Sequence, residues 1–267
     1  MTSLVDAARQ AGQPEDSLPP ARPHVLICTP CHSGKVDLHY HISLALAGGY
    51  LAQHGVDYTL DYNMGMSIDV ARSQMASTFL QKMPECTHLL FIDDDMAFSA
   101  DLPYRLLQEN VDVVAVPYRR KHKSVRFNIR HGVRVKTIQG RPYMIGVESI
   151  ATGMMLIRRN VFEKLAPVTP RYRYNDSGDG GWLFFRHQLV DDEMVGGITY
   201  MGEDYWFCKQ AREAGFDIWA YVDEDLAHIG NYAFRANYRE FAEKDTKDSF
   251  AYPGEKKPIR ILMDDAQ

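Results

Sequence analysis

The sequence predicts an α/β fold, in which a mostly parallel central sheet is covered by helices on both faces. Short runs of consecutive apolar residues, typical of strands buried on both sides, recur along the first half of the chain. Segments with helical periodicity separate these runs at short spacing, which is typical of parallel strands joined by crossover helices. With 267 residues, the chain is long enough for one large domain or two small ones.

Strands and helices alternate through the first half of the chain. Helix starts are marked by Asp37, Ser67 and Ser99, whose side chains can cap free backbone N–H groups, and Gly55 ends the first helix. Apolar runs with few polar interruptions mark the strands. We therefore expect strands at 24–30, 56–62, 89–92 and 112–118, with helices at 38–54, 68–83 and 100–109.

The second half alternates less regularly. A buried strand is expected at 154–157, a helix from residue 160, a helix at 205–214 and a strand at 218–222. Residues 171–199 combine turn residues with the aromatic pair Phe184 and Phe185, and we expect an irregular loop region beside an active site. An aromatic side chain in this region can either stack on a sugar or belong to the core.

Both ends of the chain differ from its middle. Residues 1–22 are polar and rich in proline, and we expect a flexible tail without a secretory signal. Residues 236–267 are expected to pack on the surface of a domain at 23–235. The four cysteines form no disulfide framework in a chain of this length, and no apolar run is long enough to span a membrane. These features favour a cytoplasmic protein (in a host's cytoplasm if the chain is viral).

Three consecutive carboxylates, Asp93, Asp94 and Asp95, directly follow the apolar run that ends at Ile92. If the strand continues through them, its alternation places Asp93 and Asp95 on one face. Two carboxylates placed in this way can hold Mg²⁺ or Mn²⁺, an ion that usually also binds substrate phosphates. A solvated acidic turn is an equally good interpretation of the triplet taken alone.

Two further groups of polar residues can take part in the same chemistry. Glu203 and Asp204 precede a helix, where carboxylates interact favourably with the positive end of the helix dipole, so capping is the simpler alternative to catalysis. His228 follows a strand, and imidazole together with carboxylates makes a reasonable Mn²⁺ site. A lone histidine is nevertheless more often a surface or core residue than a metal ligand.

Positive charge is concentrated in one stretch of the chain. The net charge is −5, but residues 113–147 include nine Lys or Arg and no Asp or Glu, which leaves −14 for the rest. This asymmetry predicts a surface that meets phosphates or a polyanion, and a solvated hairpin with outward-facing cations is the alternative. The nine residues are Arg119, Arg120, Lys121, Lys123, Arg126, Arg130, Arg134, Lys136 and Arg141.

Five segments, in this order along the chain, resemble the GT-A glycosyltransferases that use nucleotide sugars, close to the large family-2-type group. They resemble the family's A-R-N helix segment, its D-x-D motif, the small-residue segment under the donor sugar, the E-D motif before a helix, and the late metal-binding histidine. The departure is Ser73 in place of Asn. The segments are Ala71-Arg72-Ser73, Phe91-Ile92-Asp93-Asp94-Asp95, Ala151-Thr152-Gly153, Gly202-Glu203-Asp204 and His228-Ile229-Gly230.

The resemblance implies a GT-A fold whose Rossmann-like nucleotide-binding half, residues 23–118, is fused without a hinge to an acceptor-binding and catalytic half at 119–235. The implied activity is metal-dependent transfer of a hexosyl or pentosyl group from a nucleoside-diphosphate sugar to an acceptor hydroxyl. A direct displacement of this kind would invert the anomeric carbon, and the sequence leaves retention open as the alternative. Asp204 would be the catalytic base, supported by Glu203. Mn²⁺ or Mg²⁺ would bind Asp93, Asp95 and His228. The donor would contact Thr29, Pro30, Arg72, Asp93, Asp94, Lys121 and Gly153.

The resemblance does not identify the acceptor, and two other interpretations stay open. One is a nucleotidyltransferase with two metal ions at Asp93 and Asp95, although the chain has no glycine-rich phosphate loop. The other is a nucleic-acid-binding protein without catalysis, although the basic stretch has no ordered row of aromatic residues. As acceptor, a polyanion such as modified DNA, a teichoic-type polymer or a lipid phosphate could bind through Arg119, Arg120, Lys123, Arg126 and Arg130.

Overall fold

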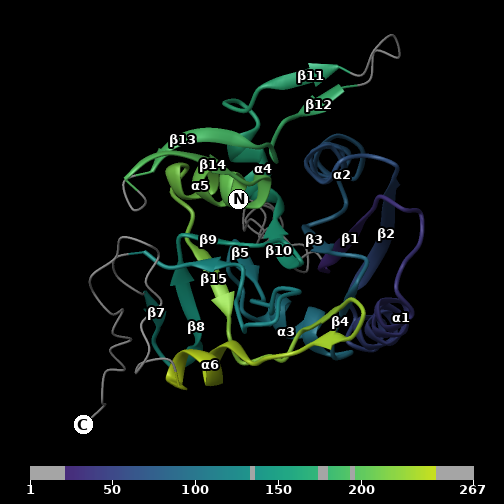
Figure 1. Cartoon of the computed structure of the whole chain (residues 1–267). Coiled ribbons are helices and arrows are strands. Elements are labelled where there is room, and N and C mark those ends of the chain that lie inside the picture. The colour runs from purple at the N-terminus through teal and green to yellow at the C-terminus, as the bar shows by residue number, and fades with distance from the viewer. Residues whose placement is uncertain (1–21, 133–135, 174–179, 193–195, 245–267) are drawn as a thin grey trace, which may run out of the picture.

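An eight-stranded sheet forms the centre of the computed structural model, which describes residues 22–132, 136–173, 180–192 and 196–244 (Figure 1). The strand order is β2-β1-β3-β10-β5-β15-β8-β7. Strands β8 and β10 run opposite to the other six, so the sheet is mixed but mostly parallel. The strands span His24–Cys31 (β1), Asp57–Met64 (β2), His88–Ile92 (β3), Val113–Ala115 (β5), Thr137–Ile138 (β7), Arg141–Val147 (β8), Met154–Arg158 (β10) and Ile218–Tyr221 (β15).

Helices cover both faces of this sheet because each central strand is apolar on both sides. Along β1, Val25 and Ile27 pack with α1 (Leu38–Gln53) and α3 (Leu102–Gln108), whereas Leu26 and Cys28 point to the opposite face. That opposite face is covered by α2 (Ile68–Lys82), α4 (Arg159–Leu165) and α5 (Glu203–Glu213). This arrangement confirms the fold class predicted from the sequence, and it is consistent with a GT-A type.

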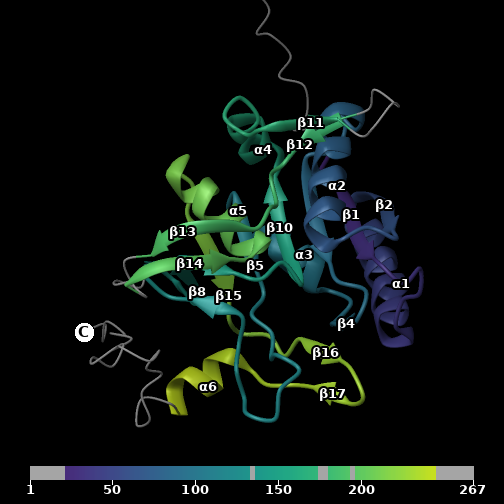
Figure 2. The same ribbon diagram turned by 45° about the horizontal axis from the view of Figure 1, so that its top comes forward.

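Several short strands surround the main sheet. Met96–Ala97 (β4) pairs with Ala227–Ile229 (β16), which also pairs with Ala233–Phe234 (β17). Ile129–Arg130 (β6) pairs with Ser149–Ile150 (β9). In Figure 2, the connection that follows β5 descends beside β16 and β17. The last described helix, α6 (Tyr238–Lys244), brings Tyr238 against Phe127 with ring centroids 5.0 Å apart.

The expectation of an irregular loop region at 171–199 is wrong for most of its described residues. Arg171–Arg173 (β11) pairs with Gly180–Trp182 (β12), and Gln188–Asp192 (β13) pairs with Gly197–Met201 (β14). Phe184 and Phe185 lie between these two hairpins and are buried. Phe185 stacks on Phe207 of α5 at 4.6 Å, so both aromatic residues belong to the core and neither is free to stack on a sugar.

Element boundaries differ from the expected ones by a few residues. Strand β1 continues past Pro30 because it pairs there with β2 only, while β3 pairs with it no further than Cys28. Helix α3 starts at Leu102, with Asp101 and not Ser99 at its N-cap. The strand expected at 112–118 is confined to Val113–Ala115. Asp37 caps α1 as predicted, since its carboxylate accepts the N–H of His39 at 2.8 Å.

Strands from 23–118 and from 119–235 lie side by side in the one large sheet. The expected N-terminal tail lies outside the described residues except for Arg22, and so does the C-terminal extension beyond Lys244. Among the described helices, none has the length and apolar character needed to cross a bilayer.

Candidate functional site

The three aspartates after β3 form a turn instead of continuing the strand. β3 ends at Ile92, and the N–H of Met96 donates to the carbonyl of Asp93 at 3.2 Å. The strand alternation used to place Asp93 and Asp95 on one face therefore does not apply. The direction of each carboxylate is set by the conformation of the turn and by the segments that hydrogen-bond to the turn.

The backbone of the turn is held by three segments that are distant in the sequence. The N–H of Asp93 donates to Gly153 at 3.0 Å, and the N–H of Ile229 donates to Asp95 at 2.8 Å. The carbonyl of Asp94 accepts the N–H of Asp37 at 2.9 Å, at the start of α1. The turn is thus fixed by the segment before β10, by β16 and by α1, which all meet at this edge of the sheet.

Arg72 of α2 joins the turn to the start of α5. Its guanidinium Nη2 lies 2.7 Å from Asp93 Oδ1, and Nη1 lies 2.5 Å from Glu203 Oε1. Only 3% of Arg72 is exposed. Burial alone would lower the pKa of the guanidinium, but Asp93 and Glu203 outweigh burial and raise it. Arg72 is therefore a permanent cation that holds two carboxylates from separate elements at one place.

Asp204 lies next to this ion pair in the first turn of α5. Burial and the neighbouring Glu203 raise the pKa of Asp204 to about 6, although Arg72 acts in the opposite direction. Its Oδ1 accepts the N–H of Tyr205 at 2.8 Å. The N-cap of α5 is Gly202, so Asp204 is not the capping residue. A buried carboxylate with this pKa is suited to accept a proton near neutral pH.

His187 lies beside two carboxylates, Glu203 and Asp69, and the sequence does not indicate this position. Its Nε2 lies 3.4 Å from Glu203 Oε2, and its Nδ1 lies 3.8 Å from Asp69 Oδ2. The ring stacks on Tyr200 of β14, with centroids 5.2 Å apart. No sequence pattern marks His187, because the approach of β13 and β14 to α5 brings it there.

Asp95 and His228 form a second cluster beyond the turn. β16 pairs with β4 and sets His228 opposite Met96, one residue after Asp95. Lys121 Nζ lies 2.5 Å from Asp95 Oδ2, and His228 Nε2 lies 3.5 Å from Asp95 Oδ1. Burial raises the pKa of Asp95, but His228 and Lys121 outweigh burial and hold that pKa below its usual value. The structure therefore brings together three residues that the sequence had singled out, namely Asp95, Lys121 and His228.

Three further residues of the expected donor site lie outside these two clusters: Asp94 of the triplet, and Thr29 and Pro30 of β1. Asp94 meets the thiol of Cys31, and burial raises the pKa of its carboxyl. Thr29 and Pro30 are buried at the end of β1, where the Thr29 hydroxyl bonds to the hydroxyl of Tyr40. The side chain of Thr29 is engaged within the protein, and the nucleotide contact expected there stays a prediction.

Tyr118 and Gly153 form the layer beneath the two clusters. A Cβ at Gly153 would lie 2.4 Å from Cε1 of Tyr118, so only glycine fits against the ring. Tyr118 is buried and meets His228 edge-on, with ring centroids 5.0 Å apart. Its hydroxyl bonds to the side chain of Asn128. The carbonyl of Gly153 also accepts the N–H of Asp93. The packing of Gly153 on Tyr118 therefore fixes how far the aspartate turn lies from the tyrosine ring.

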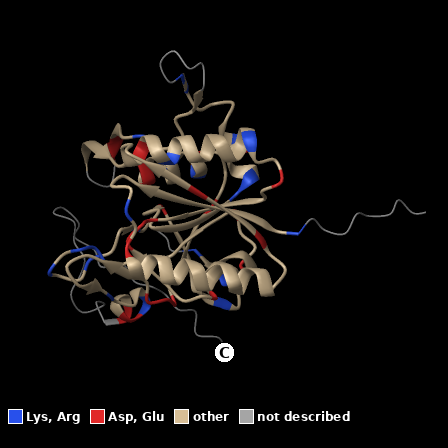
Figure 3. Cartoon of the chain, turned by 90° about the vertical axis from the view of Figure 1, so that its right-hand side faces the viewer, with Lys and Arg blue, Asp and Glu red and all other residues tan. Residues whose placement is uncertain are grey.

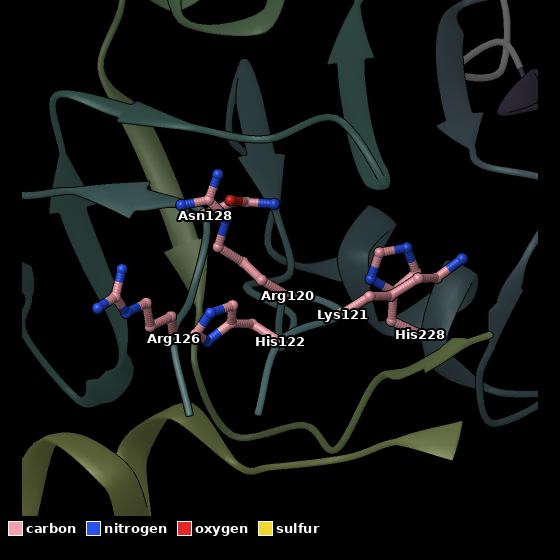
Figure 4. A pocket seen from close by; sticks show the side chains of 6 residues that line it. All are labelled: Arg120, Lys121, His122, Arg126, Asn128 and His228. Atoms are coloured by element: carbon pink, nitrogen blue, oxygen red, sulfur yellow. The ribbon is translucent and has the colours of Figure 1, made fainter. Parts of the chain in front are cut away.

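A cavity of about 390 Å³ opens beside His228 (Figure 4). Backbone bonds shape its wall, since the N–H of Arg120 donates to the carbonyl of Arg126 at 2.7 Å. Arg119 fastens the same loop by donating to the carbonyls of His122 and Lys123. The lining is strongly cationic and consists of Arg120, Lys121, His122, Arg126, Asn128 and His228.

Carboxylates from other parts of the chain neutralise much of the basic stretch. Arg130 pairs with Asp192, Lys136 with Asp217, Arg141 with Glu109 and Lys121 with Asp95. These four of the nine cations therefore already have a counter-charge within the protein. Within the described chain, no carboxylate pairs with Arg119, which donates to loop carbonyls, or with three others, and Arg134 lies outside the described residues. The three are Arg120, Lys123 and Arg126.

We predict that Gly153→Ala lowers the free energy of unfolding by about 1–3 kcal/mol, because the added methyl group must displace the Tyr118 ring or the turn at Asp93. Urea unfolding of the purified variant measures this change. Gly49→Ala in α1 is the matched control, since its Cβ would meet nothing within 4 Å. The control should be unchanged or more stable by about 0.5–1 kcal/mol. Equal stability of Gly153→Ala and the parent would contradict this account.

Solved structures similar to this chain include two partial likenesses. No family model and no curated protein matches the sequence. The crystal structure of A197 from STIV is 17% identical, with a TM-score of 0.47 over 78% of this chain and 86% of that chain. A glycosyltransferase involved in the glycosylation of the major capsid of PBCV-1 is 14% identical, with a TM-score of 0.32 over 53% of this chain and 63% of that chain.

Proposed function

We propose that this chain is a metal-dependent GT-A glycosyltransferase, which moves a sugar from a nucleoside-diphosphate sugar to an acceptor hydroxyl. The observation that carries the proposal is the pairing of two clusters at one edge of the sheet. Asp204, next to the Arg72 ion pairs, is a buried carboxylate poised to accept a proton. Asp95 and His228 stand beside a cationic cavity that can receive phosphates.

The residues around Asp95 fit a divalent cation. His228 Nδ1 lies 3.2 Å from the carbonyl of Arg119, which can only accept, so a neutral ring carries its proton on Nδ1. Nε2 then turns a lone pair toward Asp95 Oδ1, a buried oxygen without a hydrogen-bond partner. Two electron-pair donors that face each other in this way are compatible with a cation between them. Mixed imidazole and carboxylate donors are suited to Mn²⁺.

Charge balance supports the same assignment. Five carboxylates gather at this edge of the sheet, and Arg72 and Lys121 are the permanent cations paired with them. The remaining negative charge would repel a nucleoside diphosphate unless a cation neutralised it. We assign Asp95 and His228, with Asp93 nearby, to Mn²⁺ or Mg²⁺. The five carboxylates are Asp93, Asp94, Asp95, Glu203 and Asp204.

In the proposed reaction, Asp204 accepts the proton of the acceptor hydroxyl while the hydroxyl oxygen forms a bond to the anomeric carbon. The bond from that carbon to the diphosphate oxygen breaks, and its electron pair leaves with the nucleoside diphosphate. This single displacement inverts the anomeric carbon. Glu203, held by Arg72, keeps Asp204 in place and raises its pKa.

The leaving diphosphate gains negative charge, which nearby cations stabilise. A bound divalent ion would supply Lewis-acid stabilisation of that charge. Lys121, which lies against Asp95, and Arg120 in the cavity wall are the side chains placed to contact the phosphates. Gly153 packs directly on Tyr118, where any side chain would collide with the ring, and its carbonyl holds the turn at Asp93, so we assign it a supporting place in the donor site. Thr29, Pro30 and Asp94 complete the proposed donor site.

We further assign the acceptor to the anionic class, recognised by Arg120, Lys123 and Arg126. Within the described chain these three have no carboxylate partner, so a ligand phosphate would be their first counter-charge. Arg119 and Arg130 are less available, because Arg119 holds loop carbonyls and Arg130 pairs with Asp192. Non-catalytic nucleic-acid binding is disfavoured because carboxylates already neutralise much of the basic stretch.

We predict that Asp204→Asn lowers kcat by about 10²–10⁴-fold, because the amide cannot accept the acceptor proton. Donor binding should stay nearly unchanged. For the parent, kcat/KM should rise with pH through about 6 and then level off, since the base must be ionised. Nucleoside diphosphate release, followed across the pH range, measures both effects. Turnover by the variant at the parent's rate would exclude Asp204 as the base.

We predict that Asp95→Asn and His228→Ala each weaken Mn²⁺-dependent binding of a nucleoside diphosphate by at least about tenfold, because each removes a metal ligand. Isothermal calorimetry with and without Mn²⁺ provides the measurement. Asp225→Asn is the matched control, because Asp225 is an exposed carboxylate that faces Arg235 at 3.9 Å. If the donor binds the three variants equally well, the metal ligands are misassigned.

We predict that the double variant Arg120→Gln/Arg126→Gln binds a short DNA duplex about tenfold more weakly than the parent at low salt. The slope of log affinity against log salt should fall by about 2, one unit for each lost phosphate contact. Fluorescence anisotropy measures both quantities. Lys136→Gln, which removes a cation already paired with Asp217, should behave as the parent does. A parent protein that does not bind the duplex at low salt excludes DNA as the acceptor.

A further inference from the structure

We infer that the outer face of α1 and the free edge of β2 form the interface between two copies of this chain. The inference is independent of the proposed activity. It rests on a helix without Lys, Arg, Asp or Glu, an open strand edge and the continuity of their exposed apolar side chains.

Helix α1 has the composition of a helix that is covered on all sides. Its sixteen residues include no Lys, Arg, Asp or Glu. The inner side packs on the sheet through Tyr40 and Leu44. The outer side carries Leu38, Ile42 and Leu46, of which Leu38 is 67% and Leu46 is 60% exposed. The exposed side also includes His39 and His41 but no Lys, Arg, Asp or Glu, whereas a surface helix normally carries such charges on its outer side.

Strand β2 ends the large sheet and has an open edge. It pairs with β1 on one side, and no described residue pairs with its other side. The strand carries no Lys and no Pro, which are the usual devices that prevent edge strands from pairing. Every second side chain points out and is large and apolar. These residues are Tyr58, Leu60, Tyr62 and Met64, the last of which is 65% exposed.

The helix and the strand present one continuous surface. A Cβ added to Gly48 of α1 would lie 2.5 Å from the hydroxyl of Tyr58, so the ring of Tyr58 covers this part of the helix. Met64 reaches the loop before α1, where a Cβ on Gly34 would lie 3.6 Å from its sulfur. Figure 3 faces this side of the molecule, and α1 is the lower of its two long helices, drawn in tan. Exposed apolar surface that spans two elements marks an interaction site.

The charges favour a protein partner over a membrane surface. Neither α1 nor β2 carries a Lys or Arg, and β2 carries Asp57 and Asp61. Proteins that lie on anionic membranes place cations beside the apolar face, and that pattern is missing from these two elements.

A second copy of the chain can pair its own β2 edge with the open edge of β2. A two-fold axis at Leu60 would pair the β2 strands antiparallel, with Leu60 opposite its own copy, Asp57 opposite Asn63 and Asp61 opposite Thr59. No aspartate then faces another. At about half exposure, the seven apolar side chains offer roughly 600 Å² on each chain, and the paired backbones add to this. A standard interface takes about 800 Å² per partner.

Light scattering coupled to size exclusion tests this inference on the full chain. The parent should run at twice the chain mass of 30.5 kDa. Leu60→Arg and, separately, Leu46→Arg should run at the single-chain mass, because each places a charge in the interface. Ile198→Arg is the matched control, since Ile198 is an exposed apolar residue of β14, which pairs with β13 in a separate two-stranded sheet. It should remain dimeric.

Two results would overturn the inference. The first is a parent that has the single-chain mass at every concentration. If deletion of residues 1–21 then also removes the hydrogen-exchange protection of the β2 amides, the chain's own N-terminal segment is the occupant. The second is a dimer that survives Leu60→Arg and Leu46→Arg but dissociates in Ile198→Arg. Circular dichroism of each variant confirms that a change in mass does not come from unfolding.

Discussion

The buried guanidinium of Arg72 is the interaction on which the site depends. It binds Asp93, which directly follows the central strand β3, and Glu203, which begins α5. A buried ion pair contributes little net stability, but removal of one partner leaves uncompensated charge and costs about 3–5 kcal/mol. Arg72 is therefore better understood as the group that allows carboxylates to stay ionised together. Without it, burial and mutual repulsion would protonate Asp204 or separate α5 from the turn.

The second cluster is assembled by backbone pairing. β16 joins β4 directly after the aspartate turn, so His228 arrives beside Asp95 although 133 positions separate them in the printed sequence. The loop that carries Lys121 is fastened by its own backbone and by Arg119. The site therefore combines a rigid sheet edge, which places the carboxylates, with a loop that supplies the cations. Such a division suits a reaction in which the base must be held and the phosphates must be admitted.

Local patterns were sufficient to predict the fold class and to single out most of the residues that the structure brings together at the candidate site. The apolar runs and helix caps are properties of short segments, and so are the Asp93–Asp95 triplet and the Glu203-Asp204 pair. Long-range pairing could not be predicted. Arg72 was expected near the nucleotide, yet its guanidinium binds two carboxylates. His187 has no local signal, and the basic stretch is neutralised by residues such as Asp192 and Asp217 that no window of sequence connects to it.

The most direct test of a donor site at this edge of the sheet is a thermal-shift panel on the unmodified chain. Each nucleoside diphosphate and nucleotide sugar is added with and without Mn²⁺. Binding to the folded state raises Tm, and a ligand at a hundred times its Kd adds about 2.7 kcal/mol of stability. The account predicts that one nucleobase class raises Tm and does so only when Mn²⁺ is present. A Tm unchanged by every nucleotide, with or without the metal, would contradict it.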